Sequence, residues 1–230
     1  MGEMKTKTFA YILYVFAAAM LAIYFAAEIM PGFVLSTTGR LVLLCGCCIF
    51  LWLGGFALTK LTYSNKPMKI NLWIFLGLYL LLFATLTLFD PMWGRNGGFD
   101  VFWTKELFKT YAENSLNLVP FSTIAEYFAK SNFKQFMVNI AGNIACLMPL
   151  GILLPLLFKK QNNARVFLAT CTAVVAVVEL LQFLTLAGSC DIDDIILNVA
   201  GAFLIFCVVR NTKINKALKY IFILEKDEQK

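Results

Sequence analysis

Three stretches of this sequence, at 9–27, 41–58 and 70–89, are apolar, free of charged side chains and close to the length of a membrane span. A helix needs about 20 such residues to cross the hydrocarbon core of a bilayer. The composition agrees, because 60% of the residues are hydrophobic and only 15% are charged, whereas a soluble domain carries about 25% charged residues. The sequence therefore predicts a membrane protein whose helices face lipid.

Three further stretches, at 136–158, 166–187 and 195–209, are mainly apolar but contain polar side chains. The last is short and reaches the length of a span only if residues 191–194 form its first turn. Backbone polar groups in lipid must find their partners within the segment, so each stretch is expected to be helical. We predict an all-α fold, a polytopic transmembrane helical bundle of about six spans.

The basic residues of the short loops lie on one side of this predicted bundle. That side holds both termini and the loops near 60–69 and 159–165, whereas the opposite short loops carry only Arg40. Because Lys and Arg of short loops stay in the cytoplasm, we expect a multi-pass protein of the plasma membrane with both termini cytoplasmic. The net charge of +6 then suits anionic lipid headgroups and gives no reason to expect a nucleic acid partner.

One long connection, at 90–135, joins the third and fourth spans and is extracellular in this orientation. After a turn-forming start it contains two segments with helical periodicity. In the first segment Trp103, Leu107 and Tyr111 share a face, and in the second Thr123 and Glu126 have the spacing of a capping box. Helices with an apolar, aromatic face suit the membrane interface, so we predict an interfacial lid rather than a solvated loop.

The expected organisation follows from these segments. A three-span segment occupies 1–89, the extracellular connection 90–135, a three-span core 136–210 and a basic cytoplasmic tail 211–230.

Polar side chains in the last three spans recur at helical spacing. Asn139 and Asn143 are four residues apart, and Glu179 and Gln182 are three apart, so each pair shares a helix face. An ionised carboxylate at the centre of a span costs about 2.5–3.5 kcal/mol on insertion scales. Glu179 is therefore expected to face the interior of the bundle.

The last span begins with an acidic stripe. Its polar residues repeat at helical spacing, and Asp193 lies beside them. Since the fourth span enters from outside and the fifth leaves outward, all these groups are expected near the outer face in one polar pocket. The predicted binding residues are Asn139, Asn143, Glu179, Gln182, Asp191, Asp194 and Asn198. Two simpler interpretations remain open. The polar residues of the spans would only form hydrogen bonds between helices, and Asp191, Asp193 and Asp194 would only form a solvated helix start that the helix dipole stabilises.

Several segments, taken together and in order, resemble the VanZ-like family. They are NLVPF at 117–121, NIAGN at 139–143, MPLG at 148–151, ELLQ at 179–182 and DIDDIILNVAG at 191–201. The resemblance covers 114–209, and the first three spans match only in general character. One position departs from the pattern, because Gly188 stands where relatives often have Arg. A role that depends on a guanidinium group, such as clamping a phosphate, is not expected from this chain.

The resemblance implies a bacterial membrane protein related to proteins of teicoplanin-type glycopeptide resistance. It suggests a non-catalytic or weakly catalytic protein without a cofactor that acts at the outer face of the membrane. Its expected partners are membrane lipids and either a lipid-linked cell-wall precursor or a lipidated glycopeptide antibiotic, whose access to the membrane it would change.

The alternative is a membrane-embedded enzyme acting on a polyprenyl or phospholipid phosphate. The chain has no His, so this enzyme would use Glu179 as a base together with Asp194. Asp191, Asp193 and Asp194 would then hold a divalent cation such as Mg²⁺. A small transporter is a third possibility, but the inner halves of the last three spans are almost entirely apolar.

The predicted orientation can be tested by thiol labelling in intact cells after native Cys190 has been replaced. Cysteines introduced at Gly98 and Ser189 should react with a membrane-impermeant reagent, because both positions are expected outside. A cysteine at Asn163 should react only after the membrane is permeabilised. The reverse pattern would place the acidic stripe on the cytoplasmic side.

Overall fold

The computed structural model describes residues 2–30, 32, 35–89, 104–130, 133–186 and 188–222. Within these ranges six helices are long and apolar enough to cross a membrane, which confirms the predicted bundle. They are Glu3–Ala27, Thr37–Thr62, Lys66–Leu88, Phe136–Leu157, Ala164–Leu184 and Ile192–Val209. Trp103 and Gly98 lie outside the described residues.

The chain forms two compact units, one of residues 1–78 with 212–230 and one of residues 79–211. The first unit contains α1 (Gly2–Ile29), α2 (Thr37–Thr62), most of α3 (Lys66–Ala84) and α10 (Thr212–Ile221). Its helices share a buried polar contact. The Asn71 side chain donates a hydrogen bond to the Leu51 carbonyl at 2.5 Å and accepts one from the Tyr14 hydroxyl at 3.3 Å. Helices α1, α2 and α3 are thereby joined without burying an unpaired amide.

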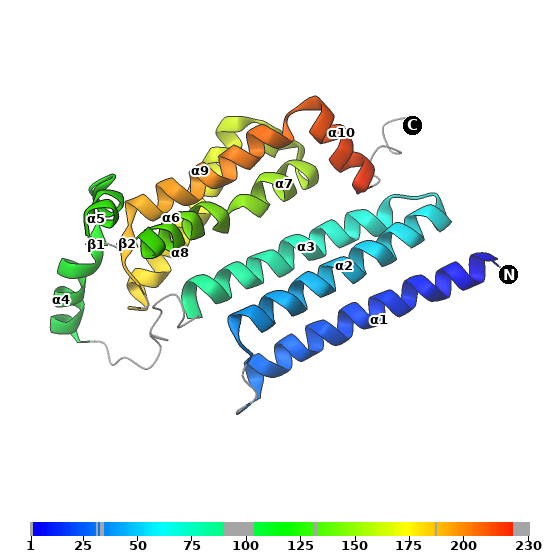
Figure 1. Ribbon diagram of the computed structural model, residues 1–230, viewed down its shortest axis with the longest axis horizontal. Coiled ribbons are helices and arrows are strands. Elements are labelled where there is room, and N and C mark those ends of the chain that lie inside the picture. The colour runs from blue at the N-terminus through cyan, green and yellow to red at the C-terminus, as the bar shows by residue number, and fades with distance from the viewer. Residues whose placement is uncertain are drawn as a thin grey trace. The chain divides into compact units, whose positions relative to one another are not determined.

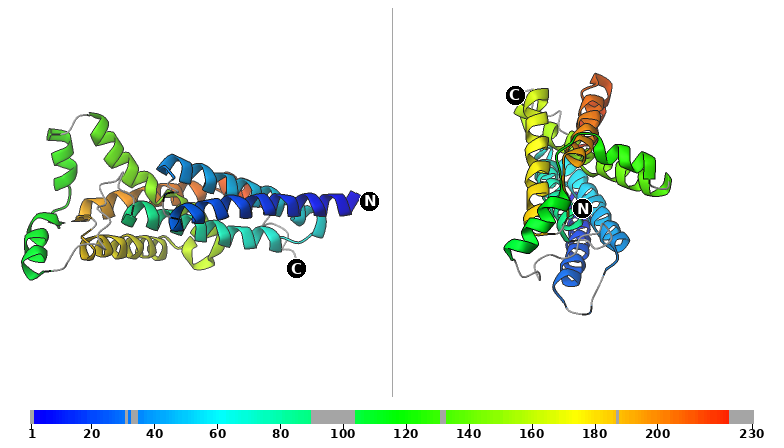
Figure 2. Two further views of the ribbon diagram at one scale, coloured as in Figure 1. Left: turned by 90° about the horizontal axis from the view of Figure 1, so that it is seen from below. Right: turned by 90° about the vertical axis from the view of Figure 1, so that its left-hand side faces the viewer.

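The second unit begins with the end of α3 and contains the last three spans (Figure 1). In chain order its further elements are η1 (Thr85–Phe89), α4 (Lys105–Ser115), β1 (Leu116–Asn117), α5 (Ser122–Lys130), α6 (Phe133–Cys146), α7 (Met148–Leu157), η4 (Lys159–Asn162), α8 (Ala164–Leu184), β2 (Cys190–Asp191) and α9 (Ile192–Val209). Figures 1 and 2 show α4 and α5 at the end of this unit where β1 and β2 lie, beyond the long helices.

The fourth span is broken at Leu147, between α6 and α7. Pro149 follows the break, and proline lacks the backbone N–H that would continue the helical hydrogen bonds. The Leu150 N–H bonds to the Leu147 carbonyl at 3.1 Å, so the Cys146 carbonyl needs another donor. The Tyr79 hydroxyl supplies it at 2.8 Å. The break is therefore stabilised by a side chain from the third span.

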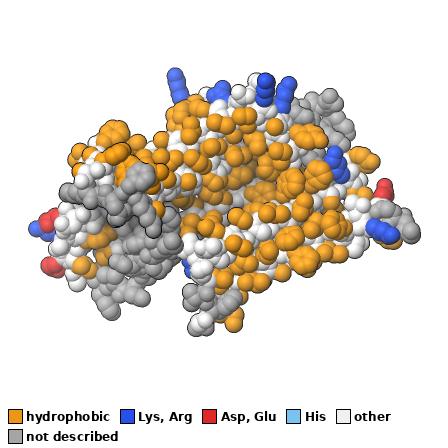
Figure 3. Space-filling view, in the orientation of Figure 1, with side chains coloured by type: hydrophobic (Ala, Val, Ile, Leu, Met, Phe, Trp, Pro, Cys, Tyr) orange, Lys and Arg blue, Asp and Glu red, His pale blue; other side chains and the backbone are white. Residues whose placement is uncertain are grey.

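Apolar side chains cover the outside of the long helices, as expected for a surface that contacts lipid. Val15 is 68% exposed, Ile49 58% and Leu204 56%. Figure 3 shows this apolar surface on one face, with Lys and Arg side chains toward its margins. A soluble protein seldom exposes so extensive an apolar surface, so the protein is a multi-pass membrane protein.

Close helix contacts in the second unit depend on small residues in α7 and α9. A side chain at Gly201 of α9 would overlap the backbone carbonyl of Ile144 in α6, and one at Gly151 of α7 would overlap Ala202 and Ile205. These glycines let the backbones of α6, α7 and α9 approach closely, which is how membrane helices gain packing energy without a hydrophobic driving force. The contact at Gly201 holds the middle of α9 against α6.

Replacing Gly201 by Ala should destabilise the protein, because the added methyl group meets backbone rather than a movable side chain. We expect a loss of about 1–3 kcal/mol, typical of overpacking, measured by thermal unfolding in detergent. Gly77 is a matched control, since nothing lies within 4 Å of a methyl group placed there. Gly77→Ala should leave stability unchanged or raise it by up to about 1 kcal/mol. Equal effects at both positions would contradict the packing role of Gly201.

Candidate functional site

The candidate site lies where the segment before the fourth span meets the start of α9. Strands β1 and β2 pair in parallel, which sets Asn117 beside Asp191 and Leu116 beside Cys190. The Tyr111 hydroxyl of α4 adds a hydrogen bond to the Gly188 carbonyl. Two segments more than seventy residues apart in the chain are joined in this way.

Asp191 is the N-cap of α9, which begins at Ile192. Both oxygens of its carboxylate accept hydrogen bonds from other residues of the protein. It accepts hydrogen bonds from the Asp193 N–H at 2.8 Å, the Asn117 amide at 3.1 Å and the Thr123 hydroxyl at 2.5 Å. Its own N–H donates to the Glu179 carboxylate of α8 at 3.2 Å. Asp191 therefore links α8, α9, β1 and α5.

Asp193 is fully buried and caps a helix to which it does not belong. Its two carboxylate oxygens accept hydrogen bonds from the Phe121 N–H at 2.5 Å and the Ile124 N–H at 3.1 Å, at the start of α5. Free backbone N–H groups at a helix start attract a negative charge. The predicted capping box of Thr123 and Glu126 is wrong: α5 begins at Ser122, and the Thr123 hydroxyl bonds to Asp191 instead.

The remaining predicted residues do not all lie at the start of α9. Asn143 donates to the Asp194 carboxylate, and the Asn198 amide donates to the Asp194 backbone carbonyl at 2.8 Å, so these residues lie with Asp191 and Glu179 around the start of α9. Gln182 is buried elsewhere, where its amide donates to the Thr87 carbonyl of η1 at 2.7 Å. Asn139 is half-buried one turn before Asn143 on α6.

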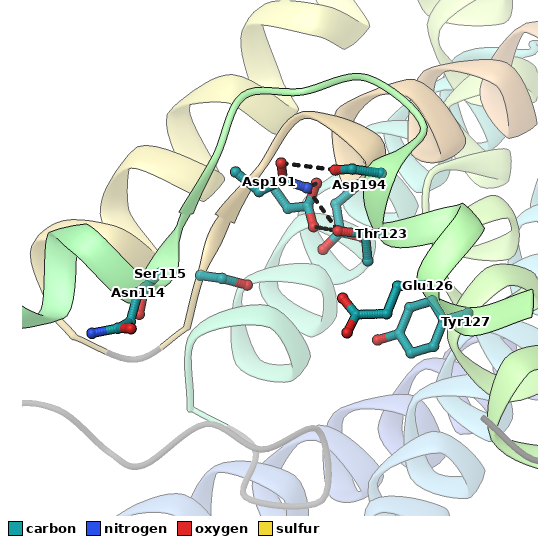
Figure 4. A pocket seen from close by; sticks show the side chains of 10 residues that line it. Asn114, Ser115, Thr123, Glu126, Tyr127, Asp191 and Asp194 are labelled. Atoms are coloured by element: carbon teal, nitrogen blue, oxygen red, sulfur yellow. Dashed lines mark hydrogen bonds between the residues drawn. The ribbon is translucent and has the colours of Figure 1, made fainter. Parts of the chain in front are cut away.

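A polar cleft of about 400 Å³ opens beside this network (Figure 4). Its lining residues are Asn114, Ser115, Asn117, Ser122, Thr123, Glu126, Tyr127, Ser189, Asp191 and Asp194. Of the residues predicted to bind, only Asp191 and Asp194 line it. In Figure 4, α4 contributes one side and α5 contributes Glu126 and Tyr127. Asp191 comes from β2 and Asp194 from the first turn of α9.

Sequence reasoning missed most of this lining. The sequence offered one signal, the segment NLVPF at 117–121, which contains Asn117 and directly precedes α5. The Asn117 side chain organises the turn, since its oxygen accepts hydrogen bonds from the Val119 N–H at 3.1 Å and the Ser122 hydroxyl at 2.9 Å. Phe121 has a positive φ of 67° at the end of this turn, an unusual backbone state for a residue with a side chain.

Three carboxylates, of Glu126, Asp191 and Asp194, line the cleft. Burial raises the pKa of the Tyr127 hydroxyl above its usual value, and the nearby charges of Asp194, Asp191 and Glu126 raise it further. Burial also raises the pKa of the Cys190 thiol, with added effects from Glu179 and Asp191. Cys190 is therefore a weaker nucleophile than an ordinary cysteine at neutral pH.

The three Asp side chains are turned toward different partners. Asp191 bonds to Asn117 and Thr123, Asp193 to the start of α5, and Asp194 to Asn143. Within the described residues, no group of three His, Cys, Asp or Glu side chains is arranged to hold a metal ion. The cleft offers carboxylate, amide and hydroxyl oxygens, which suit a ligand that donates hydrogen bonds.

These features define a class of multi-pass membrane protein in which an acidic start of the last span anchors a helical segment beside a polar cleft. The VanZ/LLP1 family profile matches residues 73–214, and the chain belongs to this family. It is 30% identical to Protein VanZ of Enterococcus faecium over 129 residues, which is 56% of this chain and 67% of the relative. The match begins within the third span, earlier than the resemblance at 114–209. No solved structure matches the chain.

Replacing Asp193 by Asn should release the start of α5, because an amide offers one acceptor oxygen where the carboxylate offers two. A charge-assisted hydrogen bond contributes about 1.5–3 kcal/mol, so hydrogen exchange in α5 should accelerate by about tenfold or more. Amides in the middle of α8 and α9 should keep their protection.

Glu106→Gln is the control, since Glu106 is an exposed acid in the first turn of α4. It should leave exchange in α5 unchanged. Unaltered exchange in Asp193→Asn would show that α5 is held by other contacts.

Proposed function

We propose that this protein acts at the outer face of the bacterial cell membrane, where it binds, or alters access to, lipid-linked cell-wall precursors or lipidated glycopeptide antibiotics of the teicoplanin type. Its polar cleft is the proposed binding site. The family relationship to Protein VanZ supports this proposal, and the position of the cleft is the single observation that carries it.

The cleft and the basic short loop at 159–165 lie at opposite ends of α8. Helix α8 begins next to η4, which carries Lys159 and Lys160, with Arg165 in its own first turn. It ends before β2, whose Asp191 lines the cleft. Since basic loops stay in the cytoplasm, the cleft is expected outside, with both termini cytoplasmic.

Exposed apolar side chains beside the cleft support a role at the membrane surface. Val119 is 65% exposed, Phe128 is 71% exposed, and Leu118 and Phe121 are also largely exposed. They flank the residues of β1 and α5 that line the cleft. Apolar side chains in such a position favour the boundary between headgroups and acyl chains, where the tail of a lipidated drug is concentrated.

The proposal predicts that the protein changes tolerance to lipidated and non-lipidated glycopeptides by different amounts. Expression in a susceptible Gram-positive host should raise tolerance to a lipidated glycopeptide more than to a non-lipidated one, because each buried CH₂ of the tail contributes about 0.8 kcal/mol of membrane anchoring. The measurement is the inhibitory concentration of each drug at matched levels of the protein in the membrane. No shift for either drug would overturn a resistance function.

Two Glu→Gln variants separate the cleft from the rest of the surface. Glu126 lines the cleft and is exposed, so Glu126→Gln should fold normally and reduce the shift for the lipidated drug. Glu113 is an exposed acid of α4 outside the cleft lining, and Glu113→Gln should keep the full shift. Equal shifts in the two variants would remove the cleft from the proposal.

A further inference from the structure

A second cavity lies beside the cleft, on another side of α9. It is a groove of about 450 Å³ between α8 and α9. Its wall includes Leu168 and Thr172 of α8 and Ile192, Ile196, Val199 and Phe203 of α9. Apart from Thr172 these side chains are apolar, and α8 and α9 are both membrane spans.

Neighbouring residues at the start of α9 line the cleft and the groove. Asp191 lines the cleft and the next residue, Ile192, lines the groove. From Ile192 the groove follows α9 to Phe203, a distance of about 16 Å at 1.5 Å per residue. One molecule with a polar head and an extended hydrocarbon chain would therefore fit both cavities at once, with the chain directed into the bilayer.

The chemistry of the cleft restricts the head. The described residues that line it include three carboxylates, of Glu126, Asp191 and Asp194, and no Lys or Arg. Asp191 is buried and Glu126 is exposed on α5, so Glu126 is more accessible to a ligand than Asp191. A phosphate group would be repelled by these charges, whereas an ammonium or hydroxyl group would find acceptors.

We propose that the cleft and the groove together bind one amphiphile, whose head is an amine-bearing or hydroxyl-rich sugar rather than a phosphate and whose chain lies between α8 and α9. This inference rests on the proposed function and narrows its ligand class. It favours a hydrocarbon chain borne on a sugar over one borne on a phosphate.

Spin-labelled amphiphiles with one common chain and three heads test the proposal. The heads are an amino sugar, a neutral sugar and a phosphate, and the full-length protein is held in phosphatidylcholine nanodiscs. The immobilised fraction in the spin-label spectrum should be largest for the amino sugar and smallest for the phosphate. We expect about a tenfold difference in association constant between these two, the size of one charge-assisted hydrogen bond.

Matched variants assign the head and the chain separately. Glu126→Gln should reduce the preference for the amino sugar, and Glu113→Gln should preserve it. Ala200→Phe, which fills the groove, should weaken binding of all three amphiphiles by a similar factor and keep their order. Ala173→Phe, at an exposed position of α8 outside the groove lining, should have no such effect.

Binding of the phosphate amphiphile as tightly as the amino sugar would overturn the proposal, as would equal effects of Ala200→Phe and Ala173→Phe. The drug assay distinguishes this failure from a failure of the proposed function. A drug shift that depends on Glu126, without any head preference, would overturn only the inference. Selective binding by a protein that gives no drug shift would overturn only the proposed function.

Discussion

The organisation of the second unit depends on the buried hydrogen bonds of two carboxylates at the start of α9. Asp191 and Asp193 accept bonds from β1 and from the beginning of α5, and both side chains are buried. A buried carboxylate is tolerated only when its oxygens are satisfied, and the free N–H groups of a helix start need an acceptor. The N–H groups at the start of α5 therefore satisfy the buried Asp193 carboxylate, and that carboxylate supplies the acceptor that these N–H groups need. The segment before the fourth span is thereby fixed to the last span.

This arrangement separates structural carboxylates from those available to a ligand. Asp193 is enclosed by the start of α5, and Asp191 is occupied by Asn117 and Thr123. Glu126, on the exposed side of α5, keeps contact with solvent at the cleft. The sequence spacing did not distinguish Asp191, Asp193 and Asp194 as possible metal ligands. In the structure each of the three carboxylates has different hydrogen-bond partners. The structure makes Glu126, which the spacing argument left out of the site, the more accessible acid.

The spans could be predicted because apolar length and the absence of charge are local properties of the sequence. The need to extend the sixth span predicted a first turn at 191–194, and the helix begins at Ile192 with Asp191 as its N-cap. The cap of α5 could not be predicted, since its acceptor, Asp193, lies about seventy residues away and local spacing pointed to Thr123. The cleft was missed for the same reason. Its residues at 114–127 become a wall only when β1 pairs with β2.

Gly188 connects this geometry with the family pattern. Its carbonyl accepts the Tyr111 hydroxyl, and the next residue, Ser189, lines the cleft. An Arg at this position, which the family resemblance led us to expect, would bring a guanidinium to the edge of the cleft and offset the negative charges of Glu126 and Asp194. Such a cleft would accept an anionic head more readily, because a guanidinium pairs well with phosphate or carboxylate. With Gly at 188, the described lining remains acidic, so this chain and a variant with Gly188→Arg should prefer heads of different charge.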